Sequence, residues 1–190
     1  RNAGLIVLVL VIVGAIVAAI LLVGGGHHTN ALVQGHTPKA SSGASPTIAS
    51  VQVYLDVTGH SFDNPGETNL TFDGNPATEW TTEHYGSPTF GNLYPGEGLI
   101  IQLKSATKLS QLKVTSTSQG WAASTYVSDT AQPNEQNVSE WGTATDSQSG
   151  IAGSAAFTLK GRTGRYVLLW ITNLGNRPYQ VNVGELAVSG

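Results

Sequence analysis

The sequence predicts an all-β domain, an antiparallel sandwich, preceded by one transmembrane α-helix. From residue 48 to residue 190, short runs alternate apolar and polar side chains with a period of two, as half-buried strands do. Clusters of Gly, Pro, Asn and Asp separate these runs, and no window shows the stripe of an amphipathic helix. Upstream, residues 5–23 are continuously apolar. We therefore expect an anchor at 1–23 (helix about 4–23), a linker at 24–47 and a β-domain at 48–190.

The composition excludes several kinds of site and partner. The 190 residues include no Met and no Cys. Without Met, Arg1 is not a natural translation start, so we expect the chain to be a piece of a longer protein. Without Cys, no disulfide, zinc–thiolate site or cysteine nucleophile can form. Residues 48–190 carry seven Lys or Arg against twelve Asp or Glu, a formal net charge of −5. Because nucleic-acid affinity depends on Lys and Arg neutralising phosphates, we expect no nucleic-acid partner.

The first element is the apolar run LIVLVLVIVGAIVAAILLV at residues 5–23. As a helix it is roughly 29 Å long at 1.5 Å per residue, which matches a hydrocarbon core of ~30 Å. The alternative is a cleaved signal peptide, whose apolar region is usually shorter, ~7–15 residues. Arg1 is the only charge on the N-terminal flank. The positive-inside rule then predicts a single-pass protein of the cell membrane with a cytoplasmic N-terminus and an extracytoplasmic C-terminal domain.

The second element, residues 24–47, is rich in Gly, Ser, Thr and Pro and predicts a flexible linker. It contains His27, His28 and His36. Metal-ligating histidines need neighbouring groups that hold them in place, and a flexible linker supplies none. We expect no metal site in this segment.

The third element is the β-domain, for which we expect seven or eight short strands. The runs that predict strands are 51–57, 99–103, 109–115, 122–127, 155–159, 166–172 and 181–188. The turn clusters that separate them are 73–76, 94–96, 118–120, 160–164 and 175–178. Many short strands in about 140 residues, with turn signals between them, are typical of an antiparallel sandwich.

One segment of this domain carries a family signature. Residues 70–80, LTFDGNPATEW, resemble the DG-x-P-x-T-x-W signature of discoidin-like (F5/8 type C) domains. These domains belong to the galactose-binding-like superfamily, which includes many carbohydrate-binding modules. The resemblance covers residues 48–190 and implies an eight-stranded jelly-roll sandwich. The runs TEHY at 82–85, GLII at 98–101 and GRYVLLWIT at 164–172 also resemble the extracytoplasmic tails of actinobacterial membrane proteins. In that group the domain follows one transmembrane helix, downstream of a MviN-type lipid II flippase or a protein-kinase-like region.

The signature offers a candidate cation site. The turn-forming sequence DGNP brings oxygens of Asp73, Asn75 and Thr78 close together, as a hard cation such as Ca²⁺ requires. The resemblance implies that such a loop often holds a structural calcium, with a Glu of the last strand completing the shell. Glu185 stands at that position. In the alternative, Asp73 and Asn75 only cap turns, Thr78 bonds the backbone, and Glu185 is solvated or pairs with an Arg.

Aromatic residues divide into core and ligand candidates. By resemblance Trp80 belongs to the core, and the apolar run around Trp170 predicts the same for that residue. Trp121 follows a turn cluster and Trp141 lies in a long polar stretch. A Trp in a polar loop can stack on a sugar ring or anchor a protein partner, although it can equally fold back over a sheet end. We name Trp121 and Trp141 as candidate ligand contacts.

Two loops supply the remaining candidates. Residues 82–97, called the aromatic loop below, contain Tyr85, Phe90 and Tyr94 and have little periodicity. The resemblance implies that loops at one end of the sandwich bind the ligand, which makes the aromatic loop the first place to expect it. Arg177 and Tyr179, in the loop before the last strand, are second candidates.

Catalysis has little support in the sequence. Only His60 and His84 lie in the predicted domain, and no G-x-S-x-G elbow or G-x-x-x-x-G-K-[ST] loop occurs. Glu83 and His84 are adjacent, so in a strand they point to opposite faces. We therefore expect this segment not to be an enzyme and to need no cofactor apart from a structural Ca²⁺.

These observations predict a membrane-tethered, extracytoplasmic binding module. It is expected to recognise cell-envelope glycan, peptidoglycan or a precursor, for a larger membrane protein. One alternative is a protein–protein module that recruits an envelope partner. Another is an accessory tail of a flippase or kinase-like protein, with no ligand of its own.

Overall fold

The computed structural model describes residues 45–131 and 137–190. The predicted anchor at 1–23 and nearly all of the predicted linker therefore lie outside the described residues. In the described ranges, no helix is long and apolar enough to span a bilayer.

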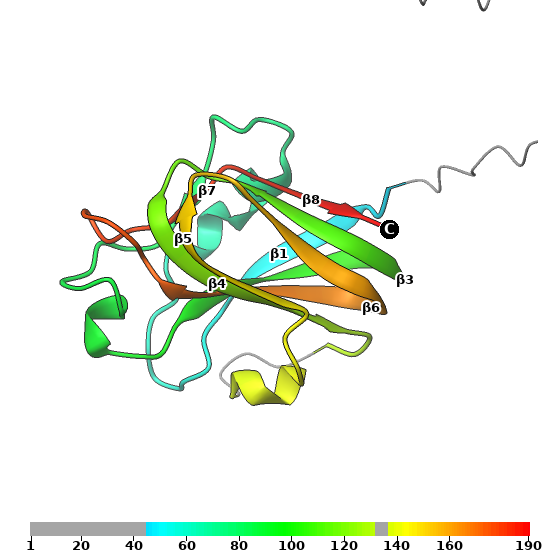
Figure 1. Cartoon of the computed structure of the whole chain (residues 1–190), viewed down its shortest axis with the longest axis horizontal. Helices are drawn as coiled ribbons and strands as arrows, with labels where there is room; N and C mark the ends of the chain where they lie inside the picture. Colours follow the sequence, from blue (N-terminus) through cyan, green and yellow to red (C-terminus); the bar gives the residue numbers. More distant parts are fainter. Residues whose placement is uncertain (1–44, 132–136) are drawn as a thin grey trace, which may run out of the picture. The chain divides into compact units, whose positions relative to one another are not determined.

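The domain is built on one large antiparallel sheet and one two-stranded sheet (Figure 1). The large sheet has the order β1-β3-β6-β4-β5, and β8 pairs with β3. Its strands are β1 (Ile48–Tyr54), β3 (Glu97–Thr115), β4 (Gln119–Ser128), β5 (Asp146–Ala152), β6 (Ala155–Asn173) and β8 (Glu185–Ser189). The small sheet pairs β2 (Trp80–Thr81) with β7 (Asn182–Val183). Three short 3-10 helices connect them: η1 (Pro65–Phe72), η2 (Phe90–Asn92) and η3 (Val138–Trp141). The predicted all-β antiparallel sandwich is confirmed.

Two long strands of the large sheet, β3 and β6, change pairing partners along their length. The first part of β3 pairs with β1 and with the end of β6, whereas its second part pairs with β8 and the start of β6. The pairing of β3 with β6 is irregular between Gln102 and Thr107, and such bulges bend strands. In Figure 1, β3 and β6 run side by side across the molecule. The prediction that residues 160–164 separate two strands is therefore wrong. Lys160 and Gly161 have positive φ but lie inside β6.

The core follows from the period-two alternation along these strands. On β3, Leu99 and Ile101 face the main core, while Ile100 faces the opposite side of the sheet. There η3 covers a second cluster. Its members are Tyr54, Ile100, Trp141, Leu168 and Trp170. Because both faces of the central strands are covered by apolar groups, residues 167–171 of β6 are apolar at every position.

The remaining differences from the predicted strands have local causes. The run at 181–188 divides into β7 and β8 at Gly184, where a Cβ atom would lie 2.6 Å from the carbonyl oxygen of Pro76. Strand β5 was not predicted because its sequence, DSQSGIA, is polar and only Ile151 is buried.

Candidate functional site

The aromatic loop does not present its rings to solvent, contrary to the prediction. Phe90 is 0% exposed and Tyr94 is 8% exposed. The Phe90 ring centroid lies 5.2 Å from that of Tyr85 and 5.4 Å from that of Tyr94, and the hydroxyl groups of Tyr85 and Tyr94 are hydrogen bonded. The three rings therefore pack against one another and the main core, because burying an aromatic side chain is worth more than exposing it in a short loop. Phe90 and Tyr94 are therefore core residues and not the ligand contacts that were predicted, and Tyr85 is half-buried.

The two tryptophans named as candidate ligand contacts also lie in the interior of the domain. Trp121 is fully buried in β4, where its ring packs against Phe157 and its Nε1–H donates to the Gly153 carbonyl at 3.0 Å. Trp141 is 5% exposed and packs edge-on against Tyr54 in the second cluster. Neither ring offers a face to a ligand. Trp80 and Trp170 are buried, as predicted.

A buried acidic pair fastens the aromatic loop to the core. The Asp63 N–H donates to Glu97 Oε1 at 2.9 Å, and the Tyr85 hydroxyl donates to the Asp63 carboxylate at 2.8 Å. Trp80 Nε1–H donates to the Asp63 carbonyl at 2.9 Å. Complete burial raises the pKa of Glu97 to about 10, and the neighbouring Asp63 carboxylate adds to the shift. Glu97 is therefore neutral near pH 7, and this network is an internal fastening rather than a ligand site.

The four predicted calcium ligands lie together. Asp73 Oδ1 accepts from the Asn75 N–H and Asp73 Oδ2 from the Thr78 hydroxyl, both at 2.8 Å. Glu185 Oε2, at the start of β8, accepts from the Gly74 N–H at 3.2 Å. Partial burial raises the pKa of Glu185, and the nearby Asp73 carboxylate raises it further, although the Gly74 N–H opposes the shift.

The donor chemistry of this loop fits a hard cation. Two carboxylates, an amide and a hydroxyl supply only oxygen, the ligand type that Ca²⁺ takes. No group of three or more His, Cys, Asp or Glu side chains converges on a point within residues 45–131 and 137–190. A cation here would therefore also need backbone, amide or hydroxyl oxygens.

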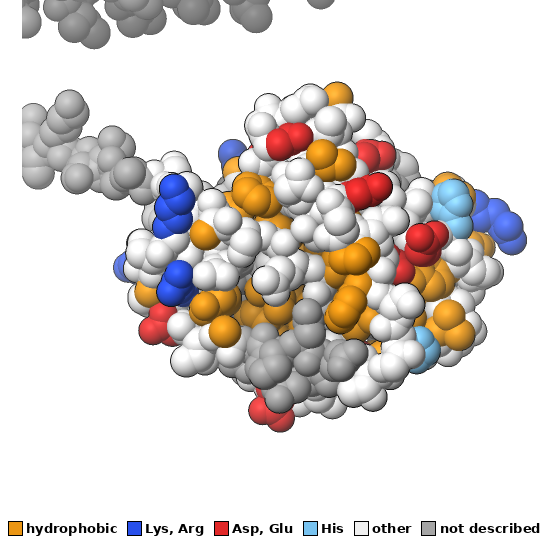
Figure 2. All heavy atoms as spheres, turned by 180° about the vertical axis from the view of Figure 1, so that it is seen from behind, with side chains coloured by type: hydrophobic (Ala, Val, Ile, Leu, Met, Phe, Trp, Pro, Cys, Tyr) orange, Lys and Arg blue, Asp and Glu red, His pale blue; other side chains and the backbone are white. Residues whose placement is uncertain are grey.

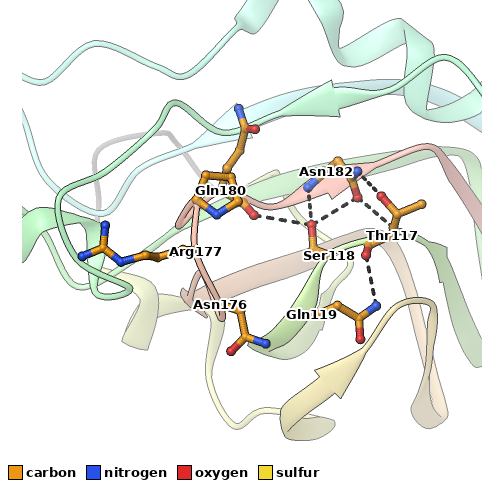
Figure 3. Close-up of a pocket in the computed structure, with 8 residues that line it drawn as sticks. Thr117, Ser118, Gln119, Asn176, Arg177, Gln180 and Asn182 are labelled. Atoms are coloured by element: carbon orange, nitrogen blue, oxygen red, sulfur yellow. Dashed lines mark hydrogen bonds between the residues drawn. The ribbon is translucent and has the colours of Figure 1, made fainter.

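One of the open polar cavities in the described part of the domain lies elsewhere, between two loops (Figure 3). One loop joins β3 to β4, and the other runs from β6 to β7. The cavity measures about 370 Å³, within the range of roughly 300–1,000 Å³ for small-ligand sites. We call it the loop pocket. It is lined by Thr117, Ser118, Gln119, Asn176, Arg177, Pro178, Gln180 and Asn182.

The floor of the loop pocket is fixed by hydrogen bonds. Asn182 Oδ1 accepts from the Ser116 hydroxyl at 2.8 Å, the Thr117 N–H at 2.9 Å and the Ser118 hydroxyl at 3.2 Å. The Ser118 hydroxyl oxygen in turn accepts from the Asn182 N–H at 2.9 Å. Figure 3 shows the bonds that join Ser118 and Asn182. These groups hold the two loops together and have little capacity left for a ligand.

The mouth of the loop pocket is different, because several of its polar groups remain free. The Asn176 side-chain amide has no hydrogen-bond partner in the described structure, and Gln119 uses only its Nε2, toward the Thr117 carbonyl. The guanidinium of Arg177 stacks on the Tyr179 ring, 5.1 Å from its centroid. Gln180 is occupied, since it contacts His84 at 2.9 Å and the Thr82 carbonyl at 2.7 Å. Asn176, Gln119 and Arg177 are therefore the groups available to a ligand.

Two glycines let the loops approach. Gly175 has φ +75°, and a Cβ atom there would overlap the carbonyl oxygen of Gln119. Gly120 has φ +78°, and its Cβ would lie 3.0 Å from Asn176 Oδ1. The Asn176 N–H donates to the Gln119 carbonyl at 2.8 Å across this contact. Both positions suit glycine, which adopts positive φ without a side-chain clash.

Sequence reasoning identified this region only in part. Arg177 and Tyr179 were candidates, and the structure places Arg177 in the pocket lining and Tyr179 beside it. Gln119, Asn176 and Asn182 were missed. Their only sequence signal is their place in or near two turn clusters, 118–120 and 175–178, which gives no sign that these loops meet.

No model of a known protein family matches the chain. Several solved structures are similar. Chitosan-binding module 2 of a chitosanase/glucanase from Paenibacillus sp. IK-5, solved with chitotriose, is 22% identical, with a TM-score of 0.53 over 74% of this chain and 95% of that one. The CBM32 domain of AlyQ, solved with 4,5-unsaturated mannuronic acid, is 18% identical, with a TM-score of 0.52 over 76% of this chain and 96% of that one. A pectin-binding carbohydrate-binding module is 13% identical, with a TM-score of 0.51 over 77% and 93%. The domain thus has the fold of these modules, the galactose-binding-like, discoidin-type sandwich.

Proposed function

We propose that this domain is a non-catalytic glycan-binding module whose ligand occupies the loop pocket. The observation that carries the proposal is the contrast between a hydrogen-bonded floor and the free groups of Asn176, Gln119 and Arg177 at the mouth. Amide side chains both donate and accept hydrogen bonds, as recognition of sugar hydroxyls demands. The lining contains no Asp, Glu or His that could serve as a general acid or base. The three similar structures are themselves described as carbohydrate-binding.

A protein-recognition role has less support. In the described ranges, Leu93, at 62% exposure, is the exposed large hydrophobic side chain, whereas protein interfaces centre on buried aromatic and apolar anchors. Figure 2 shows hydrophobic groups interrupted by polar ones across one face. We therefore place the glycan role first and treat protein recruitment as an outcome of the test below.

The proposed setting is the cell envelope, with the domain tethered to the membrane by residues 5–23 and facing outward. The support is the length and apolarity of that run and the Arg1 charge on its flank. In this setting the first candidate ligand is peptidoglycan or a precursor, bound on behalf of a larger membrane protein. Protease protection in intact cells tests the orientation: a domain resistant to external protease and cleaved only after lysis would contradict it.

The binding test uses the full chain in a mild detergent and immobilised envelope glycans, including peptidoglycan and lipid II analogues. Asn176→Ala removes a free amide and should weaken binding at least tenfold. The matched control is Asn69→Ala, since Asn69 is also an exposed asparagine but lies on η1, outside the lining. Equal binding by Asn176→Ala and the unmodified chain would reject the loop pocket as the site. Envelope binding that survives complete glycan digestion would indicate a protein partner instead.

We also propose a structural calcium at the loop of Asp73, Asn75 and Thr78, closed by Glu185. Calcium would supply a positive charge between two carboxylates and so rigidify this loop. Ligand binding to the native state adds RT ln(1 + [L]/Kd) to stability, about 2.7 kcal/mol at 100 Kd. Thermal melting should therefore shift upward with Ca²⁺ relative to EDTA, and Glu185→Gln should remove the shift. An equal midpoint with and without Ca²⁺ would count against the site.

A further inference from the structure

The loop pocket differs in charge from the rest of the domain. Residues 48–190 carry seven basic and twelve acidic side chains. Figure 2 shows acidic groups across one face and Lys and Arg mostly at its edges. In the pocket lining the balance is reversed, because Arg177 is its one ionisable side chain and no carboxylate accompanies it. An anionic ligand therefore meets a local positive charge there, in a domain whose net charge is negative.

Arg177 is also free to bind. Among the residues that the structure describes, no carboxylate pairs with its guanidinium, which only stacks on the Tyr179 ring. Arg165 provides a comparison. Its guanidinium also lies near a ring, 6.0 Å from the Tyr166 centroid, but its Nε–H donates to the Leu103 carbonyl at 3.1 Å. Arg165 is thus engaged by the fold, while the guanidinium donors of Arg177 are available.

The position of Arg177 suits a substituent on a bound sugar. Figure 3 shows its side chain extending away from Ser118 and Asn182 and lying apart from Asn176 and Gln119. Because Arg177 lies apart from the Asn176 and Gln119 amides, a sugar ring held by those amides would reach the guanidinium through an exocyclic group. A guanidinium presents a planar fork of donors that matches the two oxygens of a carboxylate.

We propose that the loop pocket selects glycans whose sugars carry a carboxylate, such as uronic acids, and that Arg177 is the residue that determines this selectivity. The inference rests on the proposed glycan-binding function and narrows its ligand class. A carboxylate is favoured over a phosphomonoester, which carries nearly two charges at neutral pH and would be matched here by a single cation in an acidic domain.

The experiment presents acidic glycans beside their carboxyl-reduced forms, which have the same linkages without the charge. The full chain in mild detergent should bind the acidic member of a pair at least tenfold more tightly. Arg177→Gln should bring the two affinities together by weakening only the acidic one, and Arg177→Lys should retain part of the preference. High salt should reduce the preference, because the Debye length falls to about 3 Å at 1 M.

The control variant is Arg162→Gln, which removes the same charge from an exposed position on β6 outside the lining. It should keep the full preference. If the chain binds acidic and reduced glycans equally, or prefers neutral or phosphorylated ones, the inference is overturned while the glycan-binding function stands. If no glycan binds at all, both proposals fail. If Arg162→Gln and Arg177→Gln lose the preference alike, the selectivity comes from net charge and Arg177 has no special role.

Discussion

The aromatic loop and the loop pocket invite comparison, because sequence reasoning favoured the first and the structure favours the second. The aromatic loop turns Phe90 and Tyr94 inward and is fastened by Asp63 and Glu97. The loop pocket contains no aromatic ring in its lining and leaves Asn176 and Arg177 exposed. In a small β-domain, large rings in loops are recruited to extend the core, since each removes much apolar surface from water. Amides and guanidinium groups stay at the surface and remain available to a ligand.

The first test of this difference between the two loops is to truncate a ring of the aromatic loop. Phe90→Ala should lower the free energy of unfolding by about 3–5 kcal/mol, the usual cost of removing a buried Phe. Leu93→Ala is the control in the same loop, and because Leu93 is 62% exposed its effect should stay within about 0.5 kcal/mol. Denaturant unfolding measures both. Folded Phe90→Ala protein should bind glycan as the unmodified chain does. If the variant instead loses glycan binding but keeps its stability, Phe90 contacts the ligand, as the sequence predicted.

The acidic pair beneath the aromatic loop gives the second prediction, a dependence of stability on pH. Glu97 holds its proton in the folded state up to about pH 10, whereas an unfolded Glu releases it near pH 4.3. Between these values the unfolded state binds fewer protons, so stability falls as pH rises, by up to about 1.4 kcal/mol per pH unit from this group. Glu97→Gln, which stays uncharged, should flatten the fall and leave the variant more stable at pH 8. Urea midpoints from pH 5 to pH 9 measure this, and parallel curves for both proteins would disprove it.

Local pattern was sufficient to predict most strands of the fold, but not their continuity. The alternation around Leu99 and around Leu109 predicts two strands, and the polar stretch between them looks like a loop. In the structure both runs belong to β3, since a strand can continue through a bulge when its partner, β6, bends with it. Strand β5 shows the opposite case, where pairing with β4 makes a strand of a polar segment.

Less of the candidate site than of the fold could be predicted from the sequence. In the sequence, nothing distinguishes Asn176 and Gln119 from other polar residues near turns. They become candidate ligand contacts because the fold brings together two segments nearly sixty residues apart. The proposed cation site is the contrasting case. Asp73, Asn75 and Thr78 are local to one turn, and a family signature also located the distant Glu185, which contacts Gly74.

The third prediction concerns Gly175, the glycine that brings the pocket loops together. Gly175→Ala places a Cβ atom against the Gln119 carbonyl, so the loop carrying Asn176 and Arg177 must move. The free energy of unfolding should fall by about 1–3 kcal/mol, the range for backbone strain, and glycan binding should weaken at least tenfold.

Gly59→Ala is the matched control for that change. Gly59 has φ +79°, close to the +75° of Gly175, but a Cβ atom there meets nothing within 4 Å. The control therefore carries the same left-handed backbone cost, about 1–2 kcal/mol, without displacing a neighbour. Its glycan affinity should equal that of the unmodified chain. If Gly175→Ala also keeps full affinity at a similar cost in stability, the close approach of the two loops is a feature of the fold and does not form the binding site.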